Sequence, residues 1–186
     1  MKDSVFLRAE KVPMTKREVR AVVLERLELE KARRFADIGA GTGSVAIEAA
    51  LRFPQLTVTA VERTPAAADI MQKNMQELGC QQVVLIRDVA PCTLESGLDA
   101  IFIGGSGGNL EDIIQWALER LMYGGRLVMT FILHDNLHEA LTYLQHCPVK
   151  QLDCVQLLAS SMTPLGSSYY FKPNNPTFIV SCIKGS

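Results

Sequence analysis

The sequence RFADIGAGTGS, residues 34–44, decides the fold of this chain. Its residues Phe35 to Ile38 predict a short buried strand, and the apolar run that starts at Val45 predicts a helix. Three alternate glycines separate the two, and these are Gly39, Gly41 and Gly43. Glycines permit positive φ and a close approach of backbone to a ligand, while the start of a helix offers free N–H groups. The stretch therefore predicts a ligand-binding turn between a strand and a helix.

The spacing within this turn separates two classes of cofactor. The dinucleotide fingerprint G-x-G-x-x-G needs a third glycine at position 44, where this chain has Ser44. The spacing here is D-x-G-x-G-x-G, with Asp37 before the first glycine, and it resembles motif I of class I S-adenosylmethionine-dependent methyltransferases. S-adenosylmethionine has no pyrophosphate, and a carboxylate at Asp37 suits its ammonium group. A tight packing turn remains the alternative.

The next expected strand, Leu56 to Glu62, ends on an acid. Glu62 follows the glycine turn by about 20 residues, where βαβ folds place the acid that binds ribose hydroxyls. A carboxylate accepts hydrogen bonds from both hydroxyls. Residue type and position therefore agree on a cofactor site, although Glu62 alone would be typical of a solvated strand end.

The rest of the chain continues the alternation of strands and helices. Further strands are expected at Val83–Ile86, Leu98–Ile103, Arg126–Leu133, Gln151–Ala159 and Thr177–Ile183, and helices at Thr64–Gly79, from Asn109 to Tyr123–Gly125, and at Asn136–His146. Thr15 and Glu18 have the spacing of a capping box, which predicts a helix start at Thr15. Residues 160–171 are expected to form a loop. Residues 1–186 are thus interpreted as one α/β domain with an irregular N-terminal arm, residues 1–14.

This order predicts the fold class. Alternating strands and helices indicate a parallel sheet, and two final strands without an obvious helix between them indicate an antiparallel hairpin. We therefore expect a Rossmann-like, seven-stranded and mostly parallel sheet with a C-terminal antiparallel hairpin, the class I methyltransferase fold.

Composition and charge reduce the classes of function that the chain can have. Of 186 residues 48% are apolar and 21% charged, and the net charge of −1 gives no indication of bulk binding to nucleic acid. Residues 1–34 nevertheless hold 10 of the 19 Lys and Arg against 6 of the 20 Asp and Glu, which suits either a solvated helix face or an anionic substrate. The five cysteines lack disulfide or zinc spacing and indicate a reduced, cytoplasmic protein. No signal peptide or membrane span is expected.

Several segments together resemble one family. These are VPMTKREVR, DIGAGTGSVAIEAA, VERTPAA, RDVAP, IFIGGSGGNL and the closing PLG and NPTFIV, which cover nearly the whole chain. They are similar to the cobalt-precorrin carbon-15 methyltransferases (decarboxylating) of cobalamin biosynthesis. The glycine loop after the fourth strand and the proline-threonine start are its more specific parts. Here the start reads Val12-Pro13-Met14-Thr15, where some relatives have an additional proline.

The resemblance implies an activity and a cofactor site. The activity would be S-adenosylmethionine-dependent methylation of carbon 15 of cobalt-precorrin-6B/7, with loss of CO₂ from the ring C acetate, in anaerobic cobalamin biosynthesis. The cofactor site would comprise Thr15, Gly39, Ala40, Gly41, Thr42, Gly43, Glu62, Asp88 and Val89. The implied assembly is a homotetramer, with residues 160–171 and the closing strands as its interface, and the carbon-5 methylase would be a separate partner.

Catalysis and substrate binding would use the segments around this site. The acceptor is an electron-rich ring carbon, so alignment with the sulfonium methyl would supply most of the catalysis. We expect the glycine loop to form the floor for the tetrapyrrole and basic residues to pair with its carboxylates; these candidates are Gly104, Gly105, Gly107 and Gly108, with Arg8, Lys11, Lys16 and Arg17. Ser106 and His134, the latter at the end of the fifth strand, are candidate catalytic residues. No metal-binding motif is present.

Two other functions stay open at this point. A methyltransferase that acts on RNA or another small metabolite would share motif I, although base-amino methylases carry an acid-Pro-Pro-aromatic motif where this chain has Gly104 to Gly107. A non-catalytic nucleotide-binding module is the other alternative.

Overall fold

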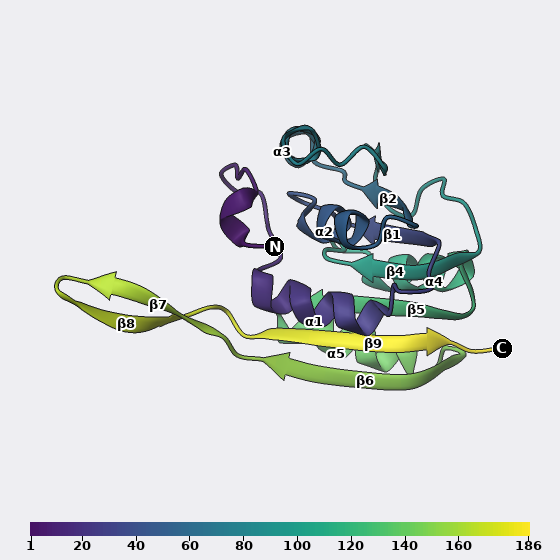
Figure 1. Ribbon diagram of the computed structural model, residues 1–186. Coiled ribbons are helices and arrows are strands. Elements are labelled where there is room, and N and C mark those ends of the chain that lie inside the picture. Colours follow the sequence, from purple (N-terminus) through teal and green to yellow (C-terminus); the bar gives the residue numbers. More distant parts are fainter.

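A computed structural model describes residues 1–186 as alternating helices and strands (Figure 1). The parallel half of the chain consists of β1 (Arg34–Ile38), α2 (Ser44–Arg52), β2 (Thr57–Val61), α3 (Pro65–Glu77), β3 (Val83–Ile86), β4 (Leu98–Ile103), α4 (Leu110–Arg120) and β5 (Leu121–Phe131). It is preceded by the 3-10 helix η1 (Asp3–Val5) and by α1 (Arg17–Leu27). It is followed by α5 (His134–Leu144), β6 (Val149–Leu157), β7 (Ser160–Leu165), β8 (Ser168–Pro173) and β9 (Thr177–Lys184).

Seven strands form one sheet in the order β3-β2-β1-β4-β5-β9-β6. Strands β1 to β5 run parallel, while β9 is antiparallel to both β5 and β6. The predicted seven-stranded, mostly parallel sheet with an antiparallel end is therefore confirmed. The strand order reverses between β1 and β4, and open α/β sheets bind ligands at the carboxyl ends of the strands beside such a reversal.

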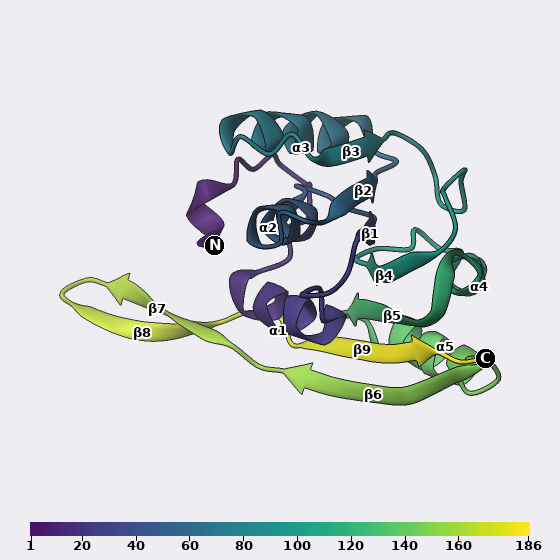
Figure 2. The ribbon, with the colours of Figure 1, turned by 45° about the vertical axis from the view of Figure 1, so that its right-hand side comes forward.

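Helices cover both faces of the sheet (Figure 2). Helices α1, α2 and α3 contribute to the core on one face, and α4 and α5 contribute to the core on the other. Strand β5 shows the alternation that this requires, because Val128 packs into the first core while Leu127 and Met129 pack into the second. A strand that is buried on both faces reads as a continuous apolar run, which explains the sequence of the central strands.

The start of α1 differs from the prediction. The helix begins at Arg17 with Lys16 as its N-cap, and no side chain caps it, so the capping box predicted at Thr15 and Glu18 is wrong. The reason is Arg20, a fully buried arginine whose guanidinium donates to the Thr15 carbonyl at 2.6 Å and also pairs with Glu48 and Asp3. This buried ion-pair network fixes the chain before α1, and the Thr15 hydroxyl takes no part in it.

The bounds of α4, β5 and α5 also differ from the predicted ones. Helix α4 ends at Arg120 rather than at Tyr123–Gly125, because the latter residues belong to an irregular first part of β5, opposite the register shift between Leu98 and Ala100. Strand β5 ends at Phe131, so His134 is the first residue of α5 rather than the end of a strand.

Residues 160–171 were predicted as a loop and instead belong to the two-stranded ribbon of β7 and β8. The ribbon lies outside the main sheet and extends away from the body of the molecule in both ribbon views (Figures 1 and 2). A hydrogen bond from Asn174 N–H to the Ala159 carbonyl, 2.9 Å long, closes its base. We define residues 158–174 as the projecting ribbon.

Candidate functional site

A cleft of about 190 Å³ lies at the carboxyl ends of β1, β2, β3 and β4. Its walls are the glycine turn after β1, the end of β2, the segment after β3, the loop after β4 and the N-terminal arm; the lining residues are Lys11, Val12, Pro13, Ile38, Gly39, Gly41, Val61, Glu62, Arg63, Thr64, Ala67, Asp88, Val89, Ala90, Gly104, Gly105, Ser106, Gly107 and Ile113. The position agrees with the reversal of strand order between β1 and β4.

The glycines of the turn are required by close backbone contacts. A Cβ on Gly39 would lie 2.7 Å from the carbonyl oxygen of Gly105, and a Cβ on Gly41 would lie 2.5 Å from that of Pro13. Both residues also have positive φ, +71° and +57°, which side-chain-bearing residues seldom adopt. The turn is thus held tightly between the loop after β4 and the N-terminal arm, and a Cβ at either position would collide with protein backbone.

Glu62 joins the glycine turn to the start of α3. One carboxylate oxygen accepts the Gly41 N–H at 2.9 Å and the other accepts the Thr64 N–H at 2.8 Å. A carboxylate has about four lone-pair sites, so each oxygen keeps one for a further donor. Glu62 is buried yet lines the cleft, and this geometry suits an acceptor for the two hydroxyls of a ribose.

Asp37 does not lie in the cleft, which corrects the prediction that it meets an ammonium group. Its side chain is buried behind the turn, where one oxygen accepts the Ala46 N–H of the first turn of α2 at 3.0 Å and the other has no partner. Burial raises the pKa of Asp37 from 3.8 to about 7; the Ala46 hydrogen bond opposes the shift and the charge of Glu62 adds to it. Asp37 thus organises the turn from within.

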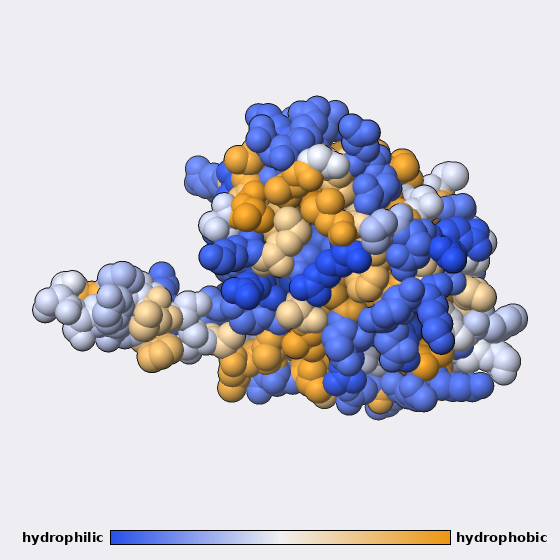
Figure 3. Space-filling view, viewed as in Figure 1, coloured by the Kyte–Doolittle hydropathy of each residue, from blue (hydrophilic) through white to orange (hydrophobic).

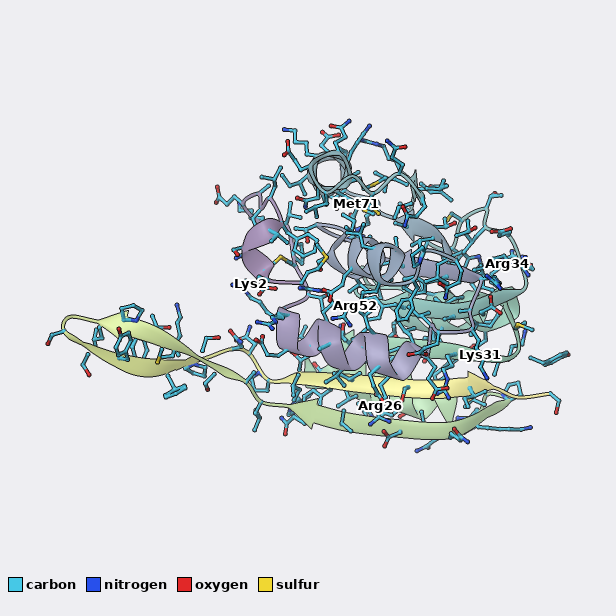
Figure 4. The ribbon with its side chains drawn as sticks, viewed as in Figure 1. Lys2, Arg26, Lys31, Arg34, Arg52 and Met71 are labelled. Atoms are coloured by element: carbon cyan, nitrogen blue, oxygen red, sulfur yellow. The ribbon has the colours of Figure 1, made fainter.

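The other predicted cofactor residues divide into two groups. Asp88 and Val89 line the cleft after β3, and both are exposed. Three residues of the turn, Ala40, Thr42 and Gly43, do not line it. Gly43 instead packs on Met71 of α3, which Figure 4 labels between α3 and α2. Thr15 lies in a second, neighbouring cavity.

The glycine loop after β4 lines the same cleft as Glu62. Gly104, Gly105, Ser106 and Gly107 all belong to its wall, whereas Gly108 does not. The loop is therefore not separate from the predicted cofactor site. A Cβ on Gly107 would overlap the guanidinium of Arg63, which has no ion-pair partner, so the absence of a side chain there is what admits the arginine.

The predicted basic and catalytic residues are dispersed. Lys11 reaches the cleft, Arg8 lines a shallow groove on the arm, and Arg17 lines neither of these. His134 lies outside the cleft, and its ring packs edge-on against Phe178 with centroids 5.1 Å apart. This aromatic contact gives His134 a packing role, and its position outside the cleft does not support the catalytic role predicted for it. Ser106 keeps its place beside the cleft.

Sequence reasoning placed Lys11 of the N-terminal arm at the site but missed its neighbours Val12 and Pro13. Val12 and Pro13 line the cleft, and the Pro13 carbonyl accepts the Thr42 N–H at 3.2 Å. The fully buried Asn74 of α3 holds the arm: its side chain bonds both the N–H and the carbonyl of Leu7 and donates to the Thr42 carbonyl at 2.9 Å. The one sequence signal for this contact was Asn74 itself, a polar residue at a core position of an amphipathic helix.

Two classes of feature are absent from the structure. None of the helices combines the length and the hydrophobicity that a membrane-spanning segment needs. No group of three or more His, Cys, Asp or Glu side chains is arranged to hold a metal ion.

The sheet topology and the position of the cleft define a class I methyltransferase fold, and solved structures superpose on this fold. A precorrin-6y C5,15-methyltransferase from Geobacter metallireducens superposes with a TM-score of 0.87 and 33% identity, over 100% of this chain and 97% of that chain. A precorrin 8W decarboxylase from Methanobacterium thermoautotrophicum superposes with a TM-score of 0.89 and 28% identity, over 97% of this chain and 98% of that chain.

Sequence comparison identifies the family. The family model of the precorrin methyltransferase domain matches residues 6–184, and the chain belongs to this family. A relative from Salmonella typhimurium, named cobalt-precorrin-6B C(15)-methyltransferase (decarboxylating), is 55% identical over 99% of this chain and 96% of its own length. The resemblance drawn from the sequence motifs is therefore confirmed, as is membership of a family of C-methyltransferases.

Proposed function

We propose that the chain binds S-adenosylmethionine and methylates carbon 15 of cobalt-precorrin-6B/7, with decarboxylation of the ring C acetate, in anaerobic cobalamin biosynthesis. The observation that carries the proposal is the position of Glu62. Its carboxylate is fixed between the N–H groups of Gly41 and Thr64 at the edge of the cleft, where it can accept hydrogen bonds from the hydroxyls of a ribose. The relative named for this reaction shares 55% of its residues with the chain.

The residues of the cleft position the two reactants. S-adenosylmethionine supplies an electrophilic methyl group when bound. Glu62 would accept the ribose hydroxyls, and Asp88 with Val89 would border the adenine. The glycine loop lets a flat ring approach its backbone, and Ser106 offers the one hydroxyl of that loop. Alignment at near-attack distance then supplies most of the catalysis, because no acid-base pair is needed for an electron-rich carbon.

Calorimetric titration tests the cofactor part of this proposal. S-adenosylmethionine should bind with one site per chain, whereas NAD should not bind, since Ser44 stands where the dinucleotide fingerprint needs its third glycine. Binding of NAD in place of S-adenosylmethionine would overturn the assignment.

We also propose that the chain forms a homotetramer, with the projecting ribbon in its interface. Met162, Leu165, Tyr169 and Phe171 are between 62% and 70% exposed on this ribbon, which stands away from the body in the space-filling view (Figure 3). An isolated two-stranded hairpin is marginally stable in water, and apolar side chains on it favour a partner surface. Light scattering at micromolar concentration should give the tetramer mass, and a monomer mass would contradict the proposal.

Two further expectations accompany this assignment. All five cysteines are free, which supports a reducing compartment and thus the cytoplasm. A carbon-5 methylase on a separate chain is a candidate partner, and co-purification of the two proteins from cells that express both would test that association.

A further inference from the structure

A second cavity, of about 540 Å³, adjoins the cleft. It shares Pro13 and Gly104 with the cleft, so the two spaces meet beside the glycine loop. Its walls come from the residues that lead into α1, from the end of β5, and from the base of the projecting ribbon. A molecule in the second cavity would therefore lie next to one bound along the glycine turn.

The lining of the second cavity combines an apolar wall with cationic groups. Phe131, Ile132 and Leu157 supply apolar surface, and the two cations are Lys16 and Lys172. Lys172 has no ion-pair partner, and Lys16 has only Asp3, at 3.9 Å. The one acid in the wall is Glu18, and the remaining polar groups are the neutral side chains of Thr15, Thr130, Asn174, Asn175 and Thr177.

We propose that the second cavity holds the body of a polycarboxylated macrocycle and that Lys172, together with Lys16, binds its carboxylates. The inference rests on the proposed function and adds the position and the recognising residues of the substrate. Lysines that lack a strong partner can form charge-assisted hydrogen bonds with carboxylates, and the apolar wall suits the face of the ring.

Lys172 assigns a second role to the projecting ribbon. The residue lies near the end of β8, opposite Ser161 of β7, and the hydrogen bond between Asn174 and Ala159 fixes the base of the ribbon next to it. The ribbon thus contributes a cation to the lining of the second cavity. Of the candidates in the basic N-terminal segment, Lys16 lines the second cavity and Lys11 lines the cleft, whereas Arg8 and Arg17 line neither.

Three variants test the inference: Lys172→Ala, Lys172→Arg and, as a matched control, Lys150→Ala. Lys150 is an exposed lysine of β6 that lines neither space. In turnover with the cobalt-precorrin, Lys172→Ala should raise KM about tenfold with little change in kcat, Lys172→Arg should restore most of the loss, and the control should behave as wild type. Affinity for S-adenosylmethionine should be the same in all four proteins.

A binding experiment separates this inference from the proposed function. Fluorescence titration with uroporphyrin, a stable polycarboxylated tetrapyrrole, needs no turnover, and Lys172→Ala should weaken its binding about tenfold relative to both wild type and Lys150→Ala. Equal affinity of Lys172→Ala and wild type, or no binding to wild type, would overturn the inference. Porphyrin binding that depends on Lys172 without any methylated product would leave the inference standing and count against the proposed reaction.

Discussion

Asp37→Asn tests whether the buried acid of the glycine turn is structural. Asn keeps an oxygen for the Ala46 N–H and places its amide nitrogen where the carboxylate has an unpartnered oxygen. The substitution removes the ability to ionise and changes little in shape. We therefore expect a pH-dependent gain in stability with unchanged affinity for S-adenosylmethionine, because Asp37 does not line the cleft.

The magnitude follows from the pKa of Asp37. Burial raises this pKa from 3.8 to about 7, so the unfolded chain ionises at a lower pH than the folded chain. Between these two values the unfolded state binds fewer protons, and the contribution of Asp37 to stability falls as the pH rises. Since one pKa unit corresponds to about 1.4 kcal/mol, the loss above the folded pKa is about 4 kcal/mol at most.

Urea unfolding of wild type and Asp37→Asn from pH 4 to pH 8 measures this effect as a difference between two proteins. The variant should match wild type near pH 4 and become more stable with rising pH, with the difference levelling above about pH 7. The exposed Asp135 gives a control variant, Asp135→Asn, whose difference from wild type should not follow this curve. A difference for Asp37→Asn that is independent of pH would refute the reasoning.

Three further variants test other parts of the account. Glu62→Ala should weaken S-adenosylmethionine binding by roughly 1.5–3 kcal/mol, as loss of a charged acceptor predicts, and calorimetry on protein shown to be folded would contradict this by finding wild-type affinity. Gly107→Val should lower both cofactor affinity and activity, because its side chain would overlap Arg63 and its φ of +70° disfavours valine; full activity would exclude the loop from the site. Asn74→Leu should cost about 1–3 kcal/mol of stability, because it leaves the N–H and carbonyl of Leu7 and the carbonyl of Thr42 without their side-chain partner. It should also expose the arm to trypsin at Arg8 and Lys11, and an unchanged cleavage rate would show that the arm is held by other contacts.

The central sheet was predictable because its signals are local. The strand ending at Ile38, the glycines after it, and the acid at Glu62 lie within one βαβ unit, and its two strands, which follow one another along the chain, pair directly. The strand starts and ends agree with the structure at Val83–Ile86 and Leu98–Ile103, where apolar runs are bounded by polar or glycine residues.

The remaining features depend on contacts between distant residues. Thr15 has the sequence of a helix cap, but Arg20 is held by Glu48, 28 residues away, and that pair decides where α1 begins. Asp37 has the type and position of a ligand residue, and only the packing of α2 over it shows that its carboxylate is buried. The ribbon β7–β8 carries apolar residues on both strands without a core to bury them, so its periodicity gives no strand signal.

Anaerobic incubation with cobalt-precorrin-6B/7 and methyl-labelled S-adenosylmethionine tests the central claim most directly. Mass spectrometry of the tetrapyrrole should show the gain of one labelled methyl group and the loss of one CO₂, and carbon NMR should place the label at carbon 15. Neither change should occur with boiled protein. A tetrapyrrole that stays unmodified while S-adenosylmethionine is bound, or a label at another carbon, would contradict the account.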